Sequence, residues 1–93
     1  MKLAVTYDNG NVFGHFGRTE AFRIYDIDGG KITSAQTVPT NGTGHGALAG
    51  FLTERGVEAL ICGGIGGGAL AALSETGIAV YPRVTGNADE AAR

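Results

Sequence analysis

Two histidines and one cysteine are the side chains in this sequence that bind soft and borderline metals. They are His15, His45 and Cys62, and none lies at the local spacing of a metal motif such as C-x-x-C. Imidazole and thiolate ligands suit zinc, copper, iron and iron–sulfur clusters. Taken singly, a cysteine that ends an apolar strand is usually a core residue, and a lone histidine is usually solvated. A metal site here therefore depends on whether the fold brings the three together.

A glycine-rich segment follows Cys62 directly, with five glycines among the six residues 63–68. Glycine lets the backbone approach a ligand closely, and the N-terminus of a following helix adds partial positive charge. The segment therefore favours binding of an anion, although a tight strand-to-helix turn is the simpler alternative. Its spacing also fits the G-x-G-x-x-G/A pattern of dinucleotide-binding proteins. That reading is weakened because no acidic residue closes the next strand, where Tyr81-Pro82-Arg83 stands.

The acidic residues Asp8, Asp26 and Asp28 are the candidates for a metal-dependent nuclease, which needs clustered carboxylates for its metal ions. Asp8 ends the first expected strand and could face the ligand edge. Asp26 and Asp28 lead into a hairpin at the far end and are expected to be solvated. No Ser/His/Asp arrangement has recognisable context, so we assign no catalytic residue and expect a binding protein rather than an enzyme.

Bulk properties narrow the function classes further. The 93 residues suffice for one domain, over residues 1–93, and the formal net charge is −2 with only seven lysines and arginines. The absence of a basic patch argues against a nucleic-acid partner. No apolar stretch approaches the length of a signal peptide core or a membrane span, so we expect no membrane partner. A single cysteine cannot form an internal disulfide, and we expect a cytoplasmic protein.

The apolar pattern predicts an α/β fold. Strands are expected over residues 3–7, 21–28, 32–39, 57–62 and 78–81, with 12–20 as a loop. Helices are expected over 45–55, from the glycine-rich segment to Gly77, and as a short turn over 87–93, with Gly56 ending the first. The first three strands should form an antiparallel meander and the later strands should pair in parallel. A five-stranded mixed sheet with helices on both faces follows, with its ligand edge at the carboxyl ends of the parallel strands.

The order of these pieces resembles the dinitrogenase iron–molybdenum cofactor biosynthesis family, the group of NifX, NafY and the C-terminal domain of NifB. The matching pieces are Asp8-Asn9-Gly10, His15-Phe16-Gly17-Arg18, Phe22-Arg23-Ile24-Tyr25-Asp26, His45, Leu48-Ala49, Ile61-Cys62-Gly63-Gly64-Ile65-Gly66, Ala69, Leu73 and Gly77-Ile78-Ala79-Val80-Tyr81. The resemblance implies a ribonuclease H-like fold and a non-enzymatic role. That role is to hold or carry iron–molybdenum cofactor, its iron–sulfur precursor or a related metal–sulfur cluster, with cofactor-assembly or nitrogenase-like proteins as partners in nitrogen fixation.

Carried over by motif, the resemblance makes His15 the leading cluster ligand, with His45 and Cys62 as supporting metal ligands. The other implied cofactor-binding residues are Gly17, Arg18, Gly63, Gly64, Ile65, Gly66 and Gly67. Two departures stand out: family members usually continue well past Arg93, so the last helix is expected to be cut short, and Arg83 occupies a position that is often glycine. A regulatory or interaction module that binds a small anion through the glycine-rich segment remains the alternative.

Overall fold

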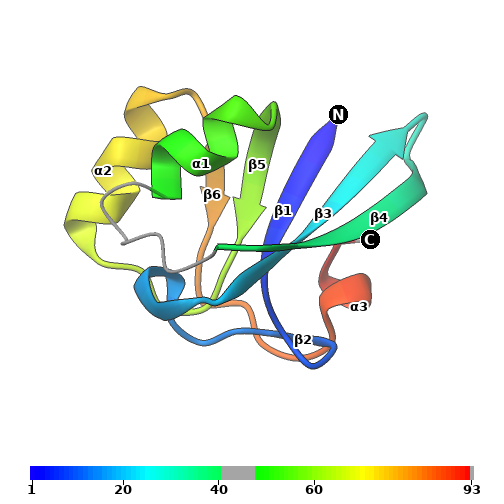
Figure 1. The fold of residues 1–93 in the computed structure, drawn as a ribbon, viewed down its shortest axis with the longest axis horizontal. Coiled ribbons are helices and arrows are strands. Elements are labelled where there is room, and N and C mark those ends of the chain that lie inside the picture. The colour runs from blue at the N-terminus through cyan, green and yellow to red at the C-terminus, as the bar shows by residue number, and fades with distance from the viewer. Residues whose placement is uncertain (41–47, 93) are drawn as a thin grey trace.

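The computed structural model describes residues 1–40 and 48–92. The elements are, in chain order, β1 (Lys2–Asp8), β2 (Asn11–Val12), the 3-10 helix η1 (Phe16–Arg18), β3 (Ala21–Asp28), β4 (Lys31–Pro39), α1 (Leu48–Glu54), β5 (Val57–Ile61), α2 (Gly67–Glu75), β6 (Ala79–Tyr81) and α3 (Ala88–Ala92). The strands form one sheet in the order β4-β3-β1-β5-β6, with the short β2 paired to β1 off this path (Figure 1). No helix in the described part of the chain is both long and apolar enough to cross a membrane.

The pairing confirms the predicted mixed sheet. β1 pairs antiparallel with β3, and β3 pairs antiparallel with β4, which is the expected meander. β5 pairs parallel with both β1 and β6. The chain enters β5 through α1 and β6 through α2, the helical crossovers that parallel pairing requires. The carboxyl ends of β1, β5 and β6 therefore meet at one edge of the sheet, the lower edge in Figure 1.

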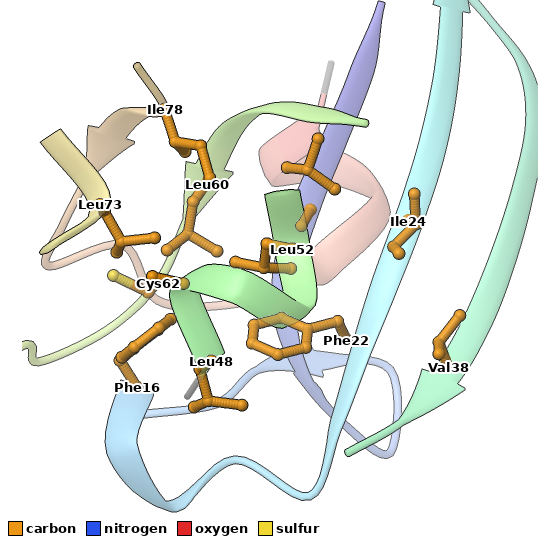
Figure 2. Packing of buried hydrophobic residues seen from close by; sticks show 13 residues of the cluster. Phe16, Phe22, Ile24, Val38, Leu48, Leu52, Leu60, Cys62, Leu73 and Ile78 are labelled. Atoms are coloured by element: carbon orange, nitrogen blue, oxygen red, sulfur yellow. The ribbon is translucent and has the colours of Figure 1, made fainter. Parts of the chain in front are cut away.

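The two faces of the sheet carry separate hydrophobic clusters, as the alternation of strand side chains requires. Ala4 belongs to the cluster under α1 and α2, whereas Leu3 and Val5 belong to the cluster under α3. Figure 2 shows the first cluster, in which Leu52 of α1 lies beside Phe22 of β3. Burial of these apolar faces holds the helices on the sheet, and the prediction of helices on both faces is confirmed.

Turns account for most of the differences from the sequence expectations. Asn9 and Gly10 both have positive φ, +47° and +91°, and join β1 to β2 as a two-residue hairpin. β2 extends into the region expected to be only a loop, over 12–20, and η1 lies within it, because two-residue and one-turn elements are too short to show a period. Gly56 and Gly77 end their helices with positive φ, as predicted. The expected helix over 45–55 corresponds to α1, and its first three expected residues lie outside the described residues.

Candidate functional site

Three loops are joined by backbone hydrogen bonds at the edge where the parallel strands end. The N–H of Gly63, just after β5, donates to the carbonyl O of Phe13 at 3.2 Å. The carbonyl O of Gly63 accepts from the N–H of Arg83, just after β6, at 2.9 Å. Gly63 therefore lies between the loop that follows β2 and the loop that follows β6, and the three loops form one continuous rim.

Gly63 is a glycine because nothing larger fits. A Cβ atom built on Gly63 would lie 2.6 Å from the Cα of Gly14, closer than real Cβ contacts allow. Gly64 is also tight, with 3.2 Å from a built Cβ to the carbonyl O of Gly14. These two glycines serve close backbone packing. The contact explains two of the five glycines in the segment without any ligand.

His15 lies beside this packed segment. It forms an isolated parallel bridge with Gly64, in which the N–H of Gly64 donates to the carbonyl O of Gly14 at 2.7 Å and the N–H of Phe16 donates to the carbonyl O of Gly64 at 2.9 Å. The side chain of Phe16 is buried and packs against the ring of Phe22, which anchors the start of η1. The imidazole of His15 is exposed and meets the ring of Phe13 edge-on. The backbone of His15 is thus fixed while its side chain faces solvent.

The other three glycines of the segment are exposed to solvent. Gly66, Gly67 and Gly68 are exposed, and a Cβ atom on any of them would meet nothing within 4 Å. Gly66 is the N-cap of α2 and makes no side-chain cap hydrogen bond. The first N–H groups of a helix have no partner within the helix, and in α2 the N–H of Leu70 donates to the carbonyl O of Gly66 at 3.0 Å. The start of α2 therefore presents backbone donors at the end of the helix that favours anions.

Cys62 lies on the other side of the loop, in the core. Its side chain has no exposed surface and packs in the cluster with Phe16 and Leu73 (Figure 2). Burial raises the pKa of the Cys62 thiol to about 11, so it is protonated at neutral pH. Metals bind the thiolate. In the described structure Cys62 therefore packs as a core residue, and its role as a metal ligand stays a prediction.

Of the other predicted site residues, some lie next to His15 and one lies outside the described residues. Gly17 and Arg18 lie in η1, directly after His15, and the N–H of Arg18 donates to the carbonyl O of His15. The side chain of Arg18 is exposed. His45 lies outside the described residues. Within residues 1–40 and 48–92, no three His, Cys, Asp or Glu side chains are grouped so that they could hold a metal ion.

The acidic residues considered for a nuclease lie at opposite ends of the sheet. Asp8 is the last residue of β1, whereas Asp26 pairs with Lys2 at its beginning. Asp28 follows at the turn between β3 and β4, and a carboxylate oxygen of Asp26 accepts from the Ser34 hydroxyl. Two metal ions with shared carboxylate ligands require side chains a few ångströms apart. These three carboxylates do not provide such a cluster.

Sequence reasoning did not assign Arg83 to the site. The structure places its backbone against Gly63, with a positive φ of +63° that is uncommon for any residue other than glycine. Its side chain is exposed. The sequence marks this position only through the resemblance, which implies glycine where Arg83 stands.

Comparison with known proteins agrees with this architecture. A relative from Methanocaldococcus jannaschii, itself uncharacterized, is 35% identical over 96 residues, which cover 97% of this chain and 80% of that protein. The crystal structure of PH0822 superposes with a TM-score of 0.91 at 29% identity, over 97% of this chain and 83% of that one. The apo form of the orange protein from Desulfovibrio gigas superposes with a TM-score of 0.84 at 27% identity, over 98% and 82% of the two chains.

The match to a family model is as extensive as these pairwise likenesses. The model for the family described as dinitrogenase iron-molybdenum cofactor matches residues 1–93. The match includes the three loops joined at Gly63 and the start of α2. This chain is a member of the dinitrogenase iron–molybdenum cofactor family.

Proposed function

We propose that this protein binds and carries an anionic metal–sulfur cluster during metallocofactor assembly. The cluster is iron–molybdenum cofactor, its precursor or a related species, and it is cargo rather than a catalytic group. The observation that carries the proposal is the open, donor-rich start of α2 at Gly66–Gly68, two residues after Gly64, whose backbone pairs with that of the exposed His15. Membership of the family supports the nature of the cargo.

Each side of this site offers a different interaction. His15 supplies an imidazole nitrogen for a metal atom at the cluster surface. The backbone N–H groups of the segment from Ile65 to Gly67 donate hydrogen bonds to cluster sulfides, which accept from amides as other anions do. Arg18 adds positive charge on the η1 side, next to Gly17. Gly63 and Gly64 act indirectly, because their packing against Gly14 fixes where His15 stands relative to α2.

The proposal gives different roles to the two supporting ligands, His45 and Cys62. His45 precedes α1 and remains a proposed second ligand. Cys62 has the lesser role, because its thiol is fully buried and its pKa is raised. A site whose donors lie at an exposed edge suits a carrier, because cargo must both enter and leave. We accordingly propose a non-enzymatic, cytoplasmic protein of ribonuclease H-like fold that exchanges its cluster with cofactor-assembly or nitrogenase-like proteins.

The start of α2 also suits a simpler ligand. Free amides at a helix N-terminus bind phosphate and similar anions without a metal ligand. A regulatory module that binds a small anion is therefore the second candidate. The two candidate functions differ in whether binding requires the imidazole of His15, because a small oxyanion held by amides does not need an imidazole ligand.

Anaerobic titration of the protein with isolated iron–molybdenum cofactor tests the proposal. The wild type should take up cofactor, measured by its visible absorption after gel filtration, and His15→Ala should lose most of that uptake. Gln36→Ala is the matched control, because Gln36 is exposed on β4 and distant in the sheet order from β5 and β6. No uptake by the wild type, or equal uptake by His15→Ala, would overturn the proposed function. A thermal shift with inorganic phosphate, unchanged in His15→Ala, would favour the second candidate.

A further inference from the structure

Arg83 adopts a backbone conformation that its side chain opposes. Its φ is +63°, in the left-handed region, where a Cβ atom crowds the following carbonyl group. Among the described residues, Asn9 is the other non-glycine residue with positive φ, and asparagine tolerates this region far better than arginine does. A strained conformation of this kind persists only where the surrounding structure imposes it.

Backbone hydrogen bonds on both sides of Arg83 impose its left-handed conformation. Its N–H donates to the carbonyl O of Gly63 at 2.9 Å, and the N–H of Val84 donates to the carbonyl O of Cys62 at 3.0 Å. The N–H of Cys62 in turn donates to the carbonyl O of Tyr81 at 3.2 Å. All of these bonds use backbone atoms. Glycine at position 83 would make the same bonds without the steric cost, so the fold itself does not require an arginine here.

The guanidinium group of Arg83 makes no contact in the described residues that would offset the steric cost of its left-handed backbone conformation. The side chain of Arg83 is exposed. Within residues 1–40 and 48–92 it makes no hydrogen bond, ion pair or ring contact, in contrast to Arg23, which bonds Thr37, and Arg55, which covers Phe51. Residues with a strained backbone and no stabilising contacts to offset the strain are concentrated at functional sites. The position of Arg83 is consistent with this, since its backbone is bonded to the glycine-rich segment.

We propose that Arg83 contacts the anionic ligand of this site and contributes a positive charge to its binding. The inference rests on the proposed function, because it takes the ligand to be an anion held at the start of α2. Arg83 stands on the rim formed by the loop after β6, whereas Arg18 stands on the η1 side. The two cations would then lie on two different loops of the site, and the strain at Arg83 is the cost of placing a charge there.

Three substitutions separate charge from strain. Arg83→Gly removes both the charge and the strain. Arg83→Gln removes the charge and keeps the strain, and Arg83→Lys keeps both. Lys31→Gln is the charge-matched control, since Lys31 is exposed at the turn between β3 and β4, at the opposite edge of the sheet. Each variant is compared with the wild type by anaerobic titration with isolated iron–molybdenum cofactor at low and high salt, and by urea unfolding.

Arg83→Gly and Arg83→Gln should both bind the cofactor about fivefold more weakly than the wild type, with a smaller salt dependence. Arg83→Lys and Lys31→Gln should bind within about twofold of the wild type. Arg83→Gly should also unfold at higher urea concentration, whereas Arg83→Gln should not. Equal binding by all variants would overturn this inference while leaving the proposed function intact. No binding by the wild type would overturn the proposed function and this inference together.

Discussion

The backbones of Gly63 and Gly14 are packed so closely that a Cβ atom at Gly63 would lie 2.6 Å from the Cα of Gly14. This contact joins the loop after β5 to the loop that carries His15. The separation of His15 from the start of α2 is therefore set by backbone packing. A site built in this way is sensitive to residues that touch no ligand.

Substitution of Gly63 by alanine should destabilise the protein by about 1–3 kcal/mol, because the added methyl group has no space and the two loops must separate. Urea unfolding followed by circular dichroism measures the change. Gly68→Ala is the matched control, since a Cβ atom there meets nothing within 4 Å and position 68 is helical. The control should leave the free energy of unfolding unchanged or raise it by up to about 1 kcal/mol. Equal destabilisation by both changes would contradict the packing argument.

The same Gly68→Ala variant should bind cofactor less well although it is no less stable. The methyl group would stand where the start of α2 is open, and loss of one backbone hydrogen bond to the ligand costs about 1 kcal/mol, or about fivefold in affinity. Cofactor titration of Gly68→Ala and wild type gives the comparison. Ala71→Gly, on the exposed part of α2 away from its first turn, serves as a control that changes helix propensity alone. Unchanged affinity of Gly68→Ala would show that the ligand does not approach this part of the loop.

The raised pKa of Cys62 predicts a specific pH dependence of stability. The unfolded thiol has its ordinary pKa of 9.0, whereas burial raises the pKa of the folded thiol to about 11. Below pH 9 both states are protonated, so this group makes no difference. Between pH 9 and 11 the unfolded state loses its proton first and is stabilised, so the free energy of unfolding should fall by about 1.4 kcal/mol per pH unit.

Comparison with Cys62→Ala isolates this contribution, since every other titratable group is the same in both proteins. Urea unfolding at several pH values from 8 to 10.5 should show a steeper decline in the wild type than in Cys62→Ala. Parallel declines would mean that the folded thiol ionises as easily as the unfolded one, and would contradict its burial.

Cys62→Ala also separates the core role of this residue from a ligand role. The smaller side chain should lower the free energy of unfolding by about 1–2 kcal/mol through the cavity it leaves beside Phe16 and Leu73. Cofactor uptake at a temperature where the variant is folded should stay within about twofold of the wild type. A loss as large as that of His15→Ala would instead assign the Cys62 thiolate as a cluster ligand.

The Asn9-Gly10 turn should be sensitive to the residue type at its first position. Asn9 has a φ of +47°, so Asn9→Ala should cost about 1 kcal/mol, whereas Asn9→Gly should be tolerated. The turn fixes β2, whose Val12 donates its N–H to the carbonyl O of Gly86 in the loop after β6. Thermal unfolding of the two variants makes the comparison. A loss of stability in Asn9→Gly equal to that in Asn9→Ala would show that the side chain, not the conformation, matters.

The sequence by itself determined the longer elements, the antiparallel meander and the parallel pairing of the later strands. Apolar alternation marks β3, the i, i+3, i+4 spacing of Leu48, Phe51 and Leu52 marks α1, and Gly56 and Gly77 mark the helix ends. These signals are local, because a period or a turn residue reports on its own few neighbours. Parallel pairing then followed from the helical connections, and it placed the loops after β1 and β5 at one edge.

Only the tertiary structure decided what each residue at that edge does. The five glycines look alike in the sequence, yet Gly63 packs against backbone while Gly68 faces open space. Cys62 and His15 are both soft ligands, yet one is buried in the core and the other is exposed. The physical reason is that burial, close backbone contact and the left-handed conformation of Arg83 arise where segments distant in sequence meet. No local pattern records those meetings.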